Sequence, residues 1–193
     1  MISKIVKEEI EKFLLEDKFT DDILIAINNC IKEVNDYIGQ YGLKASFNKN
    51  YVFSGYSAKY LAVYQVRSVA NGNIQIGINL PYIIKCMSTN NIPLKKLKTQ
   101  LNISIWHEVG HGLVEFLKRL RRLDTQNGTG LFSKQMKKDF KYIVDNEEDE
   151  AENFGAMQEG YAYYSELDDF FTQYEENIIN MLNLKPRNNK YIQ

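Results

Sequence analysis

The chain has 193 residues, of which 44% are hydrophobic and 25% charged, a balance typical of a globular domain of ordinary size. Its 24 Lys and Arg residues against 25 Asp and Glu residues give a formal charge of -1, which argues against a protein that coats nucleic acids or membrane surfaces. With 11 Gly, 3 Pro and 2 Cys, the composition also excludes collagen-like chains, disordered chains and disulfide scaffolds.

The sequence predicts a cytoplasmic protein without a membrane anchor. Charged residues interrupt the first ten positions, so there is no apolar stretch of the kind found in signal peptides. No later segment approaches the roughly 18 apolar residues that a membrane-spanning helix needs. Cys30 and Cys86 stand in unrelated contexts and are expected to be free thiols in a reducing compartment.

Apolar periodicity predicts two helices in residues 1–42, separated near residues 17–22. From about residue 43, apolar residues no longer recur at helical spacing. Residues 60–69 are rich in aromatic and β-branched side chains, and Asn71-Gly72 is a hairpin-turn signal. Residues 74–80 alternate between apolar and polar or bare positions, which is typical of a half-buried strand.

The second half of the chain is predicted to be helical. One helix starts at Pro93 and ends near Arg122, and a loop covers residues 124–133. A further helical run starts near Ser133 and extends to about Tyr174, with a break at residues 145–146. We therefore expect one domain over residues 1–184, with its core in residues 43–174, and a polar tail over residues 185–193.

The only two histidines of the chain lie four residues apart, in His107-Glu-Val-Gly-His111, on the predicted Pro93 helix. Residues at this spacing share one helix face, so both imidazoles can bind one metal ion, and zinc is well suited to imidazole nitrogen. Glu108 projects about 100° away around the helix, where it can accept a proton from a water molecule that the metal activates. A pair of histidines that merely packs on a helix is the less favoured interpretation.

A catalytic zinc ion needs a third protein ligand, and no histidine is left to supply it. An Asp or Glu is therefore expected, and the densest acidic segment is residues 145–154. Most carboxylates of this segment can equally be explained as a solvated helix N-terminus, which the helix dipole favours.

The His107–His111 motif, followed some forty residues later by Glu148-Asp-Glu-Ala-Glu-Asn-Phe-Gly155, resembles the gluzincin metallopeptidases, and most of all the ImmA/IrrE-type family. Matching the two motifs implies that Glu148 is the third ligand and that Glu152 holds the position of the residue that supports a ligand histidine. Glu147, Glu150 or Glu152 could be the ligand instead, because the acidic run permits other registers. Ala151, Phe154 and Gly155 match packing positions of the second helix of the site.

The resemblance implies an α+β, zincin-like fold: a small, mainly antiparallel twisted sheet, the motif helix and a second helix that bears the third ligand. It also implies a zinc-dependent peptidase with one Zn²⁺ ion that acts on a protein or peptide, such as a regulatory DNA-binding protein. The alternative is a zincin-shaped regulatory or binding module whose metal site is structural or vestigial.

Two further features allow weaker predictions. The polar face of the strand at residues 74–80, formed by Gln75, Gly77 and Asn79, could bind an extended substrate by strand addition. A plain solvent-facing strand surface explains it equally well. The basic cluster at residues 118–122 is expected to be the solvated end of the motif helix rather than a nucleic-acid contact.

Overall fold

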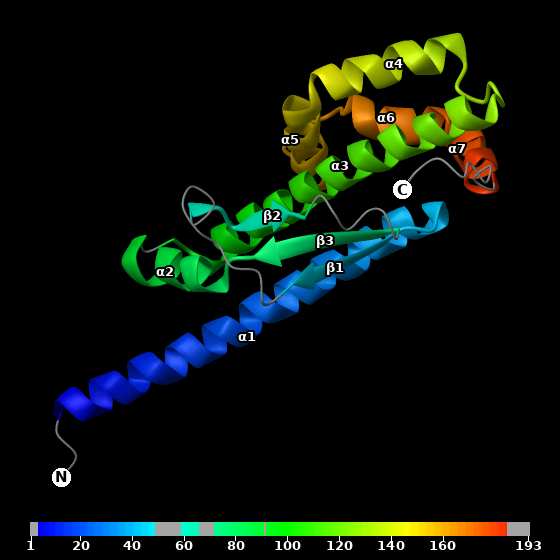
Figure 1. Cartoon of the computed structure of the whole chain (residues 1–193). Helices are drawn as coiled ribbons and strands as arrows, with labels where there is room; N and C mark the ends of the chain where they lie inside the picture. Colours follow the sequence, from blue (N-terminus) through cyan, green and yellow to red (C-terminus); the bar gives the residue numbers. More distant parts are fainter. Residues whose placement is uncertain (1–3, 49–58, 66–71, 91, 185–193) are drawn as a thin grey trace.

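The computed structural model describes residues 4–48, 59–65, 72–90 and 92–184, and it has an α+β fold that is mostly helical (Figure 1). The polar tail over residues 185–193, and the parts of the predicted strand and turn in residues 66–71, lie outside these ranges. In chain order the elements are α1 (Lys4–Ile38), η1 (Gly39–Tyr41), β1 (Lys44–Asn48), β2 (Ala62–Tyr64), β3 (Asn73–Ile78), α2 (Leu80–Asn90), α3 (Leu94–Asn127), α4 (Lys134–Asp145), α5 (Glu147–Gln158), α6 (Glu166–Gln173) and α7 (Glu175–Leu182).

The N-terminal region forms one helix, α1, and not the two helices that the sequence predicted. The expected separation at residues 17–22 contains neither Gly nor Pro, so its polar residues lower helix propensity without breaking the helix. The predicted apolar stripe of the second half is confirmed, because Ile23, Ile27 and Val34 are buried. Although α1 and α3 are long, no helix in the described ranges has an apolar stretch that could cross a membrane.

The sheet has three strands in the order β1-β3-β2, and it lies between α1 and α3 (Figure 1). β2 pairs antiparallel with β3, as expected for a hairpin, whereas β1 pairs parallel with β3. The sheet is thus mixed, and the prediction of a mainly antiparallel sheet is wrong. The reason is β1, a strand of five residues that the sequence did not lead us to expect, although Ala45 and Phe47 alternate with polar residues along it.

The side chain of Asn35 from α1 pairs with the outer edge of β1. Asn35 Oδ1 accepts a hydrogen bond from the backbone N–H of Ala45 at 2.7 Å, and Asn35 Nδ2 donates to the carbonyl oxygen of Ala45 at 3.1 Å. The amide thereby pairs with β1 much as a neighbouring strand would, which satisfies polar groups that a sheet edge otherwise exposes.

The strand predicted at residues 74–80 forms as β3, but it is the central strand. Gln75 and Gly77 therefore lie between β1 and β2, and strand addition along β3 is excluded because both its edges are paired. Asn79 instead precedes and caps α2, a helix that the sequence did not lead us to expect: its Oδ1 accepts a hydrogen bond from the N–H of Tyr82.

The motif helix α3 begins after Pro93, as predicted, but it continues to Asn127, five residues beyond the expected end at Arg122. Gly128 then adopts a left-handed conformation and ends the helix. The predicted helix start at Ser133 is confirmed, since its side chain caps α4, and so is the break near residues 145–146. The helical run predicted to extend to about Tyr174 is interrupted after this break, because α5 ends at Gln158 and α6 begins only at Glu166.

The contact between α3 and α5 depends on residues without bulky side chains. A Cβ atom placed on Gly110 would lie 3.1 Å from the Cα atom of Ala151. One placed on Gly155 would lie 2.7 Å from the carbonyl oxygen of Ile103 and 2.9 Å from the backbone nitrogen of His107. The expectation that Ala151, Phe154 and Gly155 are packing positions is confirmed, because all three are buried.

Gly155→Ala is therefore expected to destabilise the fold. The added methyl group meets backbone atoms that cannot rotate away, so α5 must move off α3, at a cost of about 1–3 kcal/mol in the free energy of unfolding. Urea denaturation measures this cost. Gly39→Ala is the control, since nothing lies within 4 Å of its added Cβ, and equal stability of the two variants would contradict the packing argument.

A partly buried hydrogen bond links α1 to α6. The hydroxyl of Tyr37 donates to Asp168 Oδ1 at 2.6 Å, and the Tyr37 ring contacts the rings of Trp106 and Phe154 edge-on. We expect Tyr37→Phe to lower the free energy of unfolding by about 1–3 kcal/mol, because the bond has a charged acceptor. Thermal denaturation should show no comparable loss for Tyr142→Phe, whose ring is half exposed.

Candidate metal centre

His107 and His111 lie one turn apart on α3 and direct the same ring atom toward each other. Their Nε2 atoms are 3.2 Å apart, and both side chains are about four-fifths buried. The predicted convergence of the two imidazoles is therefore present in the structure. It follows from the four-residue spacing on a regular helix.

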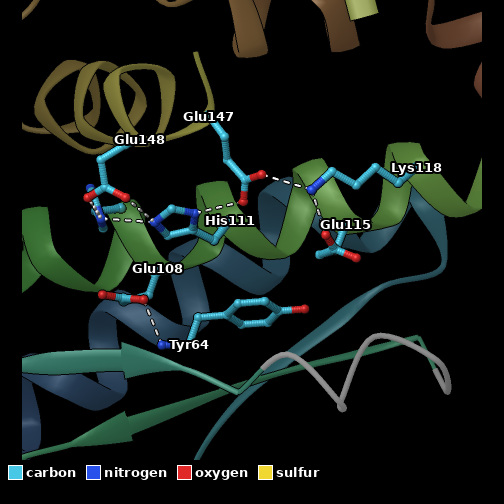
Figure 2. A network of polar contacts seen from close by, with 8 residues as sticks. Tyr64, Glu108, His111, Glu115, Lys118, Glu147 and Glu148 are labelled. Atoms are coloured by element: carbon cyan, nitrogen blue, oxygen red, sulfur yellow. Dashed lines mark hydrogen bonds and ion pairs between the residues drawn. The ribbon is translucent and has the colours of Figure 1, made fainter. Parts of the chain in front are cut away.

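Glu148, from the first turn of α5, brings a carboxylate to the same point. Its Oε1 lies 3.5 Å from His107 Nε2, and its Oε2 lies 3.4 Å from His111 Nε2 (Figure 2). Of the Glu148 side chain, 77% is exposed, so the carboxylate lies on the solvent side of the two mostly buried histidines. Among the described residues, these three form a group that could hold a metal ion.

The distances within this group can be compared with those around a tetrahedral cation. Zinc binds imidazole nitrogen and carboxylate oxygen at about 2.0–2.2 Å, so two ligand atoms at tetrahedral corners lie about 3.3–3.6 Å apart. The two Nε2 atoms are 3.2 Å apart, and each lies 3.4 to 3.5 Å from a different oxygen of Glu148. One atom from each of the three residues lies within 4.8 Å of the others. The donor set, two neutral imidazoles and one carboxylate, matches the preference of zinc and leaves one corner available.

The other acidic residues of α5 have different positions. Glu150 is buried and turned away from the histidines, and its Oε2 accepts a hydrogen bond from the N–H of Leu167 at the start of α6. Burial raises the pKa of Glu150 despite this bond. Glu152 is exposed and lies in the wall of the pocket around the histidines. Glu147 contacts His111 on the opposite ring atom, Nδ1, at 3.0 Å.

The side chain of Glu108 points from α3 toward the sheet. Its Oε2 accepts a hydrogen bond from the backbone N–H of Tyr64 in β2 at 2.6 Å (Figure 2). Burial raises the pKa of Glu108 to about 7, although the Tyr64 bond and the nearby His111 oppose this shift. The carboxylate is thus placed beside the histidines without being part of the group that they form with Glu148.

The two imidazoles have opposite pKa shifts. Burial and the neighbouring His111 lower the pKa of His107, while Glu148 and Glu152 act against this change. Burial also lowers the pKa of His111, but the hydrogen bond to Glu147 and three nearby carboxylates outweigh it, so the net shift is upward. Carboxylates therefore dominate the shift at His111, whereas burial dominates it at His107.

A pocket of about 490 Å³ opens over the histidines, with β2 and the preceding residues as one wall and α3 and α5 as the other. It is lined by Tyr60, Leu61, Ala62, Val63, Ile103, Ser104, His107, Glu108, His111, Glu148 and Glu152. Gln75, Gly77 and Asn79, which could have bound an extended substrate according to the sequence, do not line it. Ile103 and Ser104 lie one turn before His107, so helical spacing could have identified them.

The sequence predicts a strand in residues 60–69, and Leu61, Ala62 and Val63 of this segment line the pocket. No feature of these residues indicates that their strand borders the motif helix. Comparison of the chain with protein-family models, curated proteins and solved structures gives no match.

The carboxylate that completes the group can be tested by zinc binding. We expect Glu148→Ala to raise the Kd for Zn²⁺ by more than the roughly 10–100-fold that loss of an outer-shell partner costs. Glu152→Ala, a control in the same pocket, should change it little. Competition with a chromophoric chelator measures both values. A larger loss for Glu152→Ala would move the ligand assignment to that residue.

Proposed function

We propose that this chain is a zinc-dependent peptidase. The observation that carries the proposal is the convergence of His107, His111 and Glu148, whose ligand atoms lie within 4.8 Å of one another, with Glu108 in the wall of the same pocket. The motif resemblance supports the same assignment from the sequence.

His107, His111 and Glu148 would hold the ion, and the two helices from which they come determine its position. When bound, zinc supplies a Lewis acid that polarises a carbonyl group and makes water a stronger nucleophile. Glu108 Oε2 stays on the Tyr64 N–H, which orients the carboxylate, and Oε1 accepts the proton of the attacking water. Glu108 then delivers this proton to the amine that leaves.

β2 provides a binding surface for an extended substrate. The carbonyl oxygen of Leu61 and the N–H of Gln65 form hydrogen bonds on the β3 side of this strand. Because backbone groups alternate along a strand, those of Ala62 and Tyr64 point to the opposite side, where the N–H of Tyr64 donates to Glu108. Ala62 also lines the pocket. A peptide that pairs with Ala62 would lie beside the histidines, which makes β2, rather than the central strand β3, the proposed site of strand addition.

The test is Glu108→Gln. We expect hydrolysis of a fluorescently labelled, unstructured protein to fall by at least about 10²–10⁴-fold, because the proton acceptor is lost. Zinc content, measured by atomic absorption, should stay at one ion per chain. Glu152→Gln removes another carboxylate of the same pocket and should keep most of the activity.

Two outcomes would contradict the proposal. Hydrolysis that survives both Glu108→Gln and a chelator would not be zinc peptidase activity. A wild-type protein that binds one zinc ion but cleaves no polypeptide would instead support a binding or regulatory module with a structural metal site.

A further inference from the structure

Glu147 and Glu148 are adjacent in sequence but approach His111 from opposite sides of its ring (Figure 2). Glu148 lies near Nε2, whereas Glu147 Oε1 lies 3.0 Å from Nδ1. Successive residues of a helix differ by about 100° in direction, and His111 lies between the two directions at the first turn of α5. Glu147 is thus in contact with the ring atom that faces away from the proposed ion.

The second oxygen of Glu147 is held by a lysine from α3. Lys118 Nζ donates to Glu147 Oε2 at 2.8 Å and to Glu115 Oε1 at 2.7 Å (Figure 2). Both oxygens of Glu147 are therefore engaged, one by His111 and one by Lys118. Only 27% of the Glu147 side chain and 28% of the Lys118 side chain are exposed, so this network is stronger than a pair in open solvent.

These contacts determine which ring nitrogen of His111 carries the proton. A carboxylate at Nδ1 favours hydrogen at that atom, and a neutral ring with this tautomer presents its lone pair at Nε2. Nε2 is the atom that faces His107 and Glu148. The hydrogen bond also fixes the rotation of the ring, because Nδ1 and Nε2 are oriented together.

We propose that Glu147, anchored by Lys118, is the positioning residue of His111, and that the pair prepares Nε2 for a metal ion. Glu147 thus has the supporting role that the motif resemblance assigned to Glu152. The inference deepens the proposed zinc site and rests on it for the identity of the ion. Lys118, predicted only as part of a solvated basic cluster, has a second effect: it keeps the Glu147 carboxylate away from the ion and ties the start of α5 to α3.

The test compares zinc affinity in matched variants. Glu147→Ala should raise the Kd for Zn²⁺ by about 10–100-fold, because the ring loses its hydrogen-bond partner. Glu147→Gln should lie between this variant and the wild type, since its amide oxygen still accepts from Nδ1. Lys118→Met should also weaken binding, while Lys138→Met, at an exposed position on α4, and Glu152→Gln should leave it within a few-fold.

A second measurement does not depend on metal. In the metal-free wild type near pH 8.5, ¹⁵N-resolved NMR of the imidazoles should show His111 with hydrogen on Nδ1. Glu147→Ala should shift the ring toward the other tautomer, whereas Glu152→Gln should not. Circular dichroism measures whether each variant is folded. If Glu147→Ala does not fold, the isosteric Glu147→Gln is compared with the wild type instead.

The outcomes separate the two proposals. If the wild type binds no zinc, the proposed function fails, and the tautomer alone decides the role of Glu147. If Glu147→Ala changes neither the Kd nor the tautomer, or if Glu152→Gln causes the same loss, the assignment of Glu147 is overturned.

Discussion

The close approach of α3 and α5 is the constraint on which the candidate site depends. Gly110, Ala151 and Gly155 leave no side-chain layer between the helices, so the backbone of α5 lies against the backbone of His107. At a more usual interhelical distance of 8–10 Å, a glutamate from the first turn of α5 would not reach both imidazoles. Small residues on two helices thus determine a distance that the ligand side chains themselves cannot enforce.

The sequence predicts those parts of the site that arise within one helix. The spacing of His107 and His111 guarantees their convergence, and the start of α3 at Pro93 and the helix start at Ser133 follow from local signals. It does not predict the strand order, because the parallel pairing of β1 with β3 depends on contacts that are distant in sequence. The sequence also does not predict the continuity of α1, since polar residues at 17–22 are compatible with either a helix or a turn.

The acidic run at the start of α5 shows why composition cannot assign roles. Four glutamates within six residues have four different surroundings: Glu147 contacts Lys118, Glu148 faces the histidines, Glu150 caps α6 and Glu152 lines the pocket. The helix distributes neighbouring side chains around its axis, so a shift of one residue would exchange all these positions. The motif resemblance assigned Glu148 the right place near the histidines, but the contacts of Glu147 become visible only when α3 and α5 are packed together.

The amide of Asn35 affects which edge of the sheet a further strand could join. By pairing with Ala45, it occupies the place that a further strand would need beside β1. Within the described part of the chain, the remaining sheet border is the outer side of β2, where Glu108 and the histidines lie. A strand that extended the sheet at this border would lie beside Glu108 and the histidines, whereas Asn35 opposes pairing at the edge of β1.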